Sequence, residues 1–195
     1  MKKIVVLVSG GGTNLQALID AKDVIVSGKI TKVISSKPDV YALERAKNAG
    51  IPGVVIARKS FADNDSYQKA LLSELKAEQP DLIVLAGFLS IIGEEIIKEF
   101  PEKIINVHPS LIPSFCGDGF YGLKVHEAAL EKGVKVTGAT VHFVNEITDG
   151  GRIILQQPVM VEEGDTPEVL QRRVMEQAEW KILPKACELV LSGKA

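Results

Sequence analysis

Residues 4–16 read Ile-Val-Val-Leu-Val-Ser-Gly-Gly-Gly-Thr-Asn-Leu-Gln, and this segment points to the fold class most directly. The apolar run Ile4–Val8 predicts a strand that is buried on both faces. Glycines follow, and Thr13 or Asn14 can cap a helix that we expect to run from Asn14 to about Val26. A buried strand that turns through glycines directly into a helix is typical of an α/β sheet.

Further along the chain, short apolar runs alternate with amphipathic stretches. Strands are expected at residues 32–35, 53–56, 82–86 and 104–107. Helices are expected between them at residues 41–49, around the stripe Tyr67, Leu71 and Leu75, and at residues 94–100. This alternation predicts an α/β fold with a doubly wound, mostly parallel sheet.

The alternation of predicted strands and helices ends after residue 107. Residues 108–122 are rich in proline and glycine and predict a loop, followed by a helix at 123–132. Strands at 137–144 and 153–159 are joined through Asp149-Gly150-Gly151, so we expect an antiparallel C-terminal pair and a mixed sheet. Thr166-Pro167 starts a last helix towards Leu191, which we expect to kink at Pro184.

Length and composition narrow the class of protein. A chain of 195 residues favours a single domain, here 1–195. The net charge of -2 argues against a nucleic-acid partner, because such partners are held by clustered positive charge. The longest apolar run, Leu82–Leu89, is too short to span a bilayer, and the N-terminus lacks the features of a signal peptide. We therefore expect a cytoplasmic protein with no membrane partner.

The cysteines carry no evident chemistry. Cys116 and Cys187 match no zinc spacing and no CxxC pattern, so neither a metal site nor a disulfide framework is expected. Nothing in the sequence marks Cys116 as a nucleophile, although it lies in the loop at 108–122.

The loop Ser9–Asn14 has three interpretations. Its glycines and the following helix N-terminus can hold an anion such as phosphate. It can also be a tight turn without a ligand. A dinucleotide site fits less well, because Leu15 stands where a third glycine is needed and no acidic residue ends the second strand.

A second group of residues suggests acyl-type chemistry. Asn106 and His108 are two apart on a strand, so their side chains share one face and could stabilise an oxyanion. Asp149 could hold a carboxylate near His108, although it also fits a residue that only shapes its turn. We expect His126 to lie on the surface and His142 to be structural.

These motifs together resemble the phosphoribosylglycinamide formyltransferases, folate-dependent enzymes of purine synthesis. The resemblance spans nearly the whole chain and rests on segments that share one order and spacing: Ile4–Gln16, Ala86–Phe88, Asn106–Pro113, Gly138–Val144 and Asp149–Gly151. Asn-x-His-Pro-Ser-Leu-x-Pro at residues 106–113 is the most specific of them. The resemblance implies 10-formyltetrahydrofolate as the co-substrate, glycinamide ribonucleotide as the formyl acceptor, and no metal.

The resemblance also assigns site residues. Asn106, His108 and Asp149 match the family's catalytic trio. Substrate contacts are expected from the phosphate loop, which corresponds to Gly12, Thr13 and Asn14. A carboxylate that meets the ribose hydroxyls corresponds to Glu179. Folate contacts are expected from Asn106, from the segment Leu89, Ser90, Ile91 and Ile92, and from the separate position Asn64.

The chain departs from the commoner family pattern in places. Ser90 and Asn64 stand where many members carry arginine, which affects the expected contacts to the folate glutamate. The loop Ser114–Gly122 is longer than in the common form, and Trp180 follows Glu179 where histidine is usual. None of these differences removes a member of the trio.

Three other functions remain as alternatives. A formyltetrahydrofolate deformylase would carry an N-terminal regulatory domain, but the first strand here begins at Ile4. A Met-tRNA formyltransferase would carry a C-terminal domain and a basic surface, but this chain stops at Ala195 with net charge -2. A nucleotide-binding module without chemistry would not need Asn106, His108 and Asp149. The sequence leaves the oligomeric state open.

Overall fold

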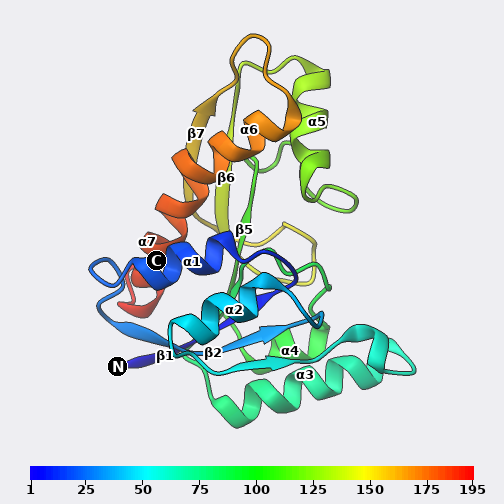
Figure 1. Ribbon diagram of the computed structural model, residues 1–195, viewed down its shortest axis with the longest axis vertical. Helices are drawn as coiled ribbons and strands as arrows, with labels where there is room; N and C mark the ends of the chain where they lie inside the picture. Colours follow the sequence, from blue (N-terminus) through cyan, green and yellow to red (C-terminus); the bar gives the residue numbers. More distant parts are fainter.

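A seven-stranded sheet runs through the centre of the computed structural model, which describes residues 1–195 (Figure 1). The strand order is β3-β2-β1-β4-β5-β6-β7, parallel from β3 to β5 and antiparallel at β6 and β7. This confirms the predicted α/β class with its antiparallel C-terminal pair. The strands are β1 (Lys2–Val8), β2 (Gly28–Ser35), β3 (Gly53–Val55), β4 (Leu82–Leu85), β5 (Ile104–His108), β6 (Val136–Phe143) and β7 (Ile153–Met160).

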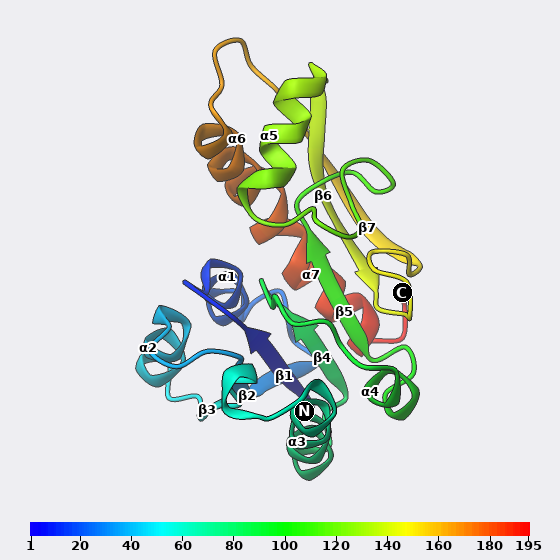
Figure 2. The ribbon, with the colours of Figure 1, turned by 90° about the vertical axis from the view of Figure 1, so that its right-hand side faces the viewer.

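Helices cover both faces of the sheet (Figure 2). One face packs against α1, α2 and α7 in a cluster of 27 buried residues, and the other packs against α3 and α4 in a cluster of 12. The helical segments are α1 (Thr13–Asp20), α2 (Tyr41–Asn48), η1 (Arg58–Ser60), α3 (Asn64–Glu78), α4 (Glu94–Glu99), α5 (Leu123–Lys132), α6 (Pro167–Val174), η2 (Met175–Glu179) and α7 (Trp180–Leu191).

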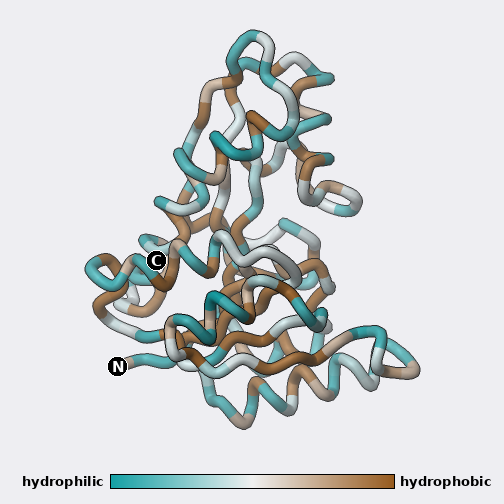
Figure 3. The backbone as a smooth tube through the Cα atoms, viewed as in Figure 1, coloured by the Kyte–Doolittle hydropathy of each residue, from teal (hydrophilic) through white to brown (hydrophobic).

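The first strand shows why the apolar run in the sequence is continuous. Ile4, Val6 and Val8 enter the larger cluster, whereas Val5 and Leu7 enter the smaller one. Because side chains alternate between the faces of a strand, a strand covered on both faces must be apolar at every position. Figure 3 shows hydrophobic residues along the central strands, with hydrophilic residues on the outer helices.

The chain reverses its winding direction beside β1. From β1 it moves outward to β2 and β3, and it then returns to β4 and continues to β5 on the other side. Such a switch leaves a crevice beyond the carboxyl ends of the strands, where ligands bind in open α/β sheets. β6 and β7 extend past the parallel strands and carry α5 and α6 at their far end (Figure 1).

One helix prediction was wrong. The first helix ends at Asp20 rather than near Val26, and a turn follows in which Ile25 N–H donates to Ala21 O. The β-branched residues at 24–26 disfavour helix, which accounts for the early end. In the last helix the α-helical pattern breaks at the π turn η2, while Pro184 lies within α7.

No helix in the structure combines the length and the hydropathy that crossing a membrane would require.

Candidate active site

A cavity of about 530 Å³ lies beyond the carboxyl ends of β1, β4 and β5. Its lining comes from segments that are far apart in sequence: residues 10–14, 85–92, 106–109, 117–122 and 144–149. All three motifs singled out in the sequence therefore meet in one cavity, at the place where the sheet topology predicts a ligand site.

The glycine loop forms one wall of this cavity. Gly12 is the N-cap of α1 and adopts a left-handed conformation, with φ 72° and ψ 34°. A Cβ atom at Gly12 would lie 2.7 Å from the Cβ of Ala42, so α2 leaves no space for a side chain. The N–H groups of Gly11, Gly12, Thr13 and Asn14 donate no hydrogen bond within the chain, so they are available to a ligand.

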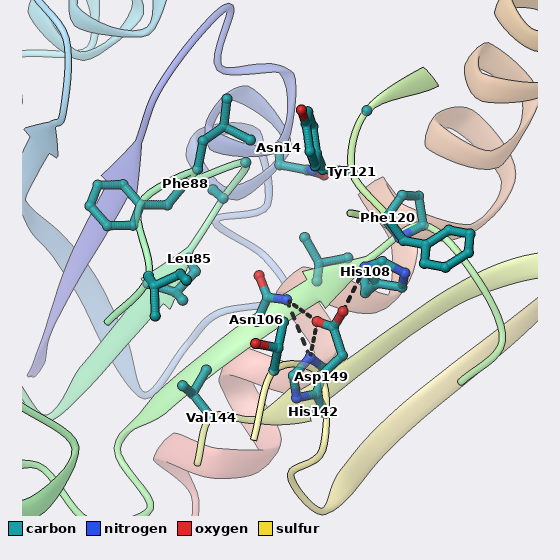
Figure 4. Close-up of a pocket in the computed structure, with 18 of the residues that line it drawn as sticks. Asn14, Leu85, Phe88, Asn106, His108, Phe120, Tyr121, His142, Val144 and Asp149 are labelled. Atoms are coloured by element: carbon teal, nitrogen blue, oxygen red, sulfur yellow. Dashed lines mark hydrogen bonds and ion pairs between the residues drawn. The ribbon is translucent and has the colours of Figure 1, made fainter. Parts of the chain in front are cut away.

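Asn106, His108 and Asp149 lie together at the centre of the cavity (Figure 4). Asn106 Nδ2 donates to Asp149 Oδ1 at 3.4 Å. His108 Nδ1 lies 3.5 Å from Asp149 Oδ2, and these two side chains are 6% and 8% exposed. The structure therefore brings a carboxylate to His108, as the sequence analysis expected, with the amide of Asn106 beside it.

His142 completes this cluster, although the sequence analysis assigned it only a structural role. In the antiparallel pairing of β5 with β6, Asn106 lies opposite His142. His142 Nδ1 donates to Phe143 O at 2.8 Å, so the Nε2 of a neutral ring can accept from Asn106 Nδ2 at 3.2 Å. His142 thereby orients the Asn106 amide. The pairing register places it there, and nothing in its local sequence indicates that position.

The loop at 114–122 supplies backbone contacts to the cluster. Phe115 O lies 2.8 Å from His108 Nε2, and Gly117 N–H donates to Asp149 Oδ2 at 2.9 Å. Both nitrogens of His108 therefore face acceptors. Because a neutral imidazole has only one N–H, only the imidazolium form satisfies both contacts. Phe120 and Tyr121 of the same loop also line the cavity (Figure 4).

Asp149 is adapted to remain ionised. Burial alone would raise the pKa of its carboxyl, but the adjacent His142, the Gly117 N–H and the charge of His108 outweigh burial and lower the pKa. The carboxylate therefore stays charged inside the cavity, where it faces His108 Nδ1.

Glu179 reaches the cavity from the π turn η2. Its carboxylate accepts from Asn14 Nδ2 at 2.7 Å and is 4% exposed. Burial raises the pKa of Glu179 to about 7, and the bond from Asn14 opposes this shift. In an α-helix, residues eight apart differ by roughly 80° in direction. The wider π turn offsets this rotation, so Gln171, Met175 and Glu179 all line the cavity.

The segment Leu89–Ile92 forms a further part of the cavity wall. Leu89 N–H donates to Ser9 Oγ at 2.9 Å, and Ile91 O accepts from Gln68 Nε2 at 2.8 Å. Gln68 Oε1 also accepts from the N–H of Gly93 at 2.9 Å. These contacts hold the segment at both ends and leave backbone groups of Ser90 and Ile92 free of these bonds.

Comparison with known proteins matches the same residues to one family. The model of the formyl transferase family matches residues 2–187. A phosphoribosylglycinamide formyltransferase of Haemophilus influenzae is 43% identical over 195 residues, which cover 100% of this chain and 89% of that protein. This chain belongs to the phosphoribosylglycinamide formyltransferase family.

Solved structures of the phosphoribosylglycinamide formyltransferase family share the fold. Glycinamide ribonucleotide transformylase 1 from Symbiobacterium toebii has a TM-score of 0.92 and 42% identity, covering 99% of this chain and 89% of that chain. The phosphoribosylglycinamide formyltransferase of Bacillus halodurans has a TM-score of 0.90 and 33% identity, covering 100% of this chain and 97% of that chain. The fold predicted from the resemblance is therefore confirmed.

Some relatives of this chain are much longer proteins. The human trifunctional purine biosynthetic protein adenosine-3 is 45% identical over 192 residues, which cover 98% of this chain. The chain spans 18% of the length of that protein, and 14% of the length of its Drosophila melanogaster counterpart.

The structure does not bring every residue expected from the formyltransferase resemblance to the cavity. Asn64 is exposed at the start of α3 and does not line the cavity. Ser90 does line it, together with Leu89, Ile91 and Ile92. No lysine or arginine is part of the lining. This cavity therefore offers no lysine or arginine side chain to a ligand.

His126 was predicted to lie on the surface, and this was wrong. It is buried in α5, and neither ring nitrogen has a hydrogen-bond partner. Burial, with a smaller contribution from the charge of His108, lowers the pKa of His126 to about 4. The helical spacing from Val125 and His126 to Ala129, which are all buried, is the signal that could have revealed this.

Cys116 shows no sign of activation. Burial, with a contribution from the charge of Asp149, raises the pKa of its thiol. No group of three or more histidine, cysteine, aspartate or glutamate side chains is arranged so that it could hold a metal ion.

Proposed function

We propose that the chain transfers the formyl group of 10-formyltetrahydrofolate to the amine of glycinamide ribonucleotide, in de novo purine synthesis. The observation that carries this proposal is the meeting of the Asn106–His108–Asp149 cluster with the free N–H groups of the glycine loop in one cavity. The names of the full-length relatives support it. We further propose that residues 1–195 act as one cytoplasmic formyltransferase domain.

The two substrates have separate places in this proposal. The phosphate of the ribonucleotide lies on the N–H groups of Gly12, Thr13 and Asn14, where the dipole of α1 favours an anion. The ribose hydroxyls meet Glu179, whose carboxylate is already held by Asn14. The folate ring lies against Leu89–Ile92, which also line the cavity.

The reaction needs charge stabilisation and proton transfer. The amine attacks the formyl carbon, forming a C–N bond and a tetrahedral oxyanion. His108 Nε2–H exchanges Phe115 O for this oxyanion, and Asn106 contributes its amide. Asp149 keeps His108 charged and relays the amine proton through water. The bond from the formyl carbon to the folate nitrogen then breaks, and that nitrogen takes up a proton. No covalent intermediate with the enzyme is needed.

The decisive test is formylation of the acceptor by the purified protein. The protein is incubated with 10-formyltetrahydrofolate, with and without glycinamide ribonucleotide, and formylated ribonucleotide is measured by mass spectrometry. We expect formylated product only with the acceptor, and little formate without it. Release of formate at the same rate without acceptor would instead support a deformylase. Binding of ribonucleotide without any turnover would support a non-catalytic nucleotide-binding module.

A further inference from the structure

The phosphate site of this cavity lacks a cationic side chain of its own. No lysine or arginine lines the cavity, whereas the carboxylates of Asp149 and Glu179 do. A helix N-terminus provides the equivalent of roughly half a positive charge, which is less than a phosphate carries. A positively charged side chain that lies outside the lining but contacts the loop would therefore supply part of the missing charge.

Arg45 of α2 supplies such a contact. Its Nε donates to Gly11 O at 2.9 Å, and its Nη1 donates to Gln16 Oε1 at 3.0 Å. Its guanidinium also lies 4.8 Å from the centre of the Tyr41 ring. The side chain thus bridges the glycine loop and α1 from the side facing α2, and a planar guanidinium is suited to such a bridge.

This contact sets the direction of a peptide group. In a planar trans peptide, the C=O of one residue and the N–H of the next point in opposite directions. Arg45 holds the Gly11 carbonyl on the α2 side, so the Gly12 N–H points away from α2. Ala42 N–H donates to Gly10 O at 3.2 Å, which orients the Gly11 N–H in the same way.

The two N–H groups that result face the cavity without partners. Neither Gly11 N–H nor Gly12 N–H donates a hydrogen bond within the chain, and both residues line the cavity. Successive N–H groups that point into one concavity bind anions. The contacts from α2 therefore pre-organise the loop before any ligand arrives.

We propose that Arg45 is a positioning residue for the phosphate of the acceptor. It holds the Gly11 carbonyl so that the Gly12 N–H faces the phosphate, and it places a positive charge behind the loop. The identity of the acceptor rests on the proposed function, but the affinity of the loop for phosphate does not.

The test compares variants at Arg45 with a control on the same helix. Arg45→Ala removes both hydrogen bonds and the charge, Arg45→Lys keeps the charge without the fork, and Lys47→Ala changes an exposed cation of α2. The Kd for inorganic phosphate is obtained from the rise in Tm with phosphate concentration. The KM values for ribonucleotide and formyl folate, and kcat, are measured in parallel.

We expect Arg45→Ala to raise the phosphate Kd and the ribonucleotide KM about tenfold, as for loss of a hydrogen bond from a charged donor. Neither kcat nor the folate KM should change by more than about twofold, because the side-chain hydrogen bonds of Arg45 go to Gly11 and Gln16 and not to the folate segment or the catalytic cluster. Arg45→Lys should recover part of the loss, and Lys47→Ala should resemble the wild type.

Two results would overturn the proposal. One is a phosphate Kd and a ribonucleotide KM that stay close to the wild-type values in Arg45→Ala. The other is an equal rise in both KM values with no recovery in Arg45→Lys, which would show a role in folding only. If the wild type transfers no formyl group but Arg45→Ala still weakens phosphate binding, the proposed function fails and the role of Arg45 stands.

Discussion

The carboxylate of Glu179 accepts a hydrogen bond of 2.7 Å from Asn14 Nδ2, and this bond joins the π turn η2 to the first turn of α1. The two residues are 165 positions apart in sequence. Asn14 Oδ1 is buried without a partner. The pair therefore leaves one buried acceptor unpaired, next to the N–H groups of the glycine loop.

This pair predicts a pH dependence of stability. The pKa of Glu179 is raised from 4.5 to about 7 in the folded protein, so the folded state holds a proton that the unfolded state releases between these values. The contribution of Glu179 to the free energy of unfolding is therefore greatest below about pH 4.5 and is lost as the pH rises through 7. The loss is on the order of 3 kcal/mol.

Glu179→Gln should remove this dependence, because an amide cannot ionise. Urea unfolding of wild type and variant from pH 5 to pH 8 measures it, and the variant should gain relative stability as the pH rises. Glu176→Gln, at an exposed position of the same turn, serves as the control and should follow the wild type. Parallel curves for wild type and Glu179→Gln would show that Glu179 is ionised throughout.

The catalytic cluster predicts a loss of turnover without a loss of fold. His108→Ala and Asn106→Ala should each lower kcat by about 10²–10³, the usual effect of removing an oxyanion donor. Asp149→Asn should also be severe, because it removes the negative charge that faces His108 Nδ1 at 3.5 Å. Steady-state kinetics and Tm are measured together. Near-normal turnover in Asn106→Ala would refute its assigned role.

His142 should matter through Asn106. His142→Phe removes the Nε2 acceptor that lies 3.2 Å from Asn106 Nδ2, so the amide can turn away from the reacting atoms. We expect kcat to fall about 10²-fold, as for a misplaced catalytic group, with little change in the ribonucleotide KM. In the double variant with Asn106→Ala the two losses should not add. Full additivity would mean that His142 acts independently.

The glycine loop predicts a change in acceptor binding. At Gly12 a side chain would meet Ala42 at 2.7 Å and would also strain a backbone with φ 72°. Gly12→Val should therefore raise the ribonucleotide KM strongly, with little effect on folate binding. Gly10→Ala is a matched control, because a Cβ there meets no atom within 4 Å. Equal use of acceptors with and without phosphate by the wild type would contradict the assignment.

The folate tail should contribute little to binding. No lysine or arginine lines the cavity, and neither Asn64 nor Ser90 can form the bidentate pair that arginine forms with a carboxylate. Removing the glutamate from the donor should cost about 1 kcal/mol or less, as for an exposed ion pair. Ser90→Arg should increase this cost. The measurement is kcat/KM for donors with and without the glutamate.

Arg58 and Lys59 lie in η1, a few residues before Asn64 at the start of α3. If the glutamate tail does contribute to binding, the competing explanation is that one of these cations replaces the missing arginine. A large effect in the wild type that disappears in Arg58→Ala or Lys59→Ala would favour one of these cations. A large effect that both variants retain would contradict the prediction outright.

The local sequence was enough to predict the sheet with its first helix, and the two strand residues at the centre of the site. The unbroken apolar run at Ile4–Val8 requires a strand covered on both faces, and the glycines after it place a helix N-terminus at the carboxyl edge of the sheet. The spacing of Asn106 and His108 puts both side chains on one face of β5. These features depend only on residues that are close in sequence, so the pattern of the sequence predicts them.

Tertiary structure alone decided the partners that surround this centre. His142 meets Asn106 because β5 and β6 pair in one register, and Arg45 meets Gly11 because α2 packs against the glycine loop. Glu179 reaches Asn14 through an extra residue in the turn that precedes α7. Strand register, helix packing and turn type are settled by which surfaces the whole chain can bury together, and no local pattern encodes them.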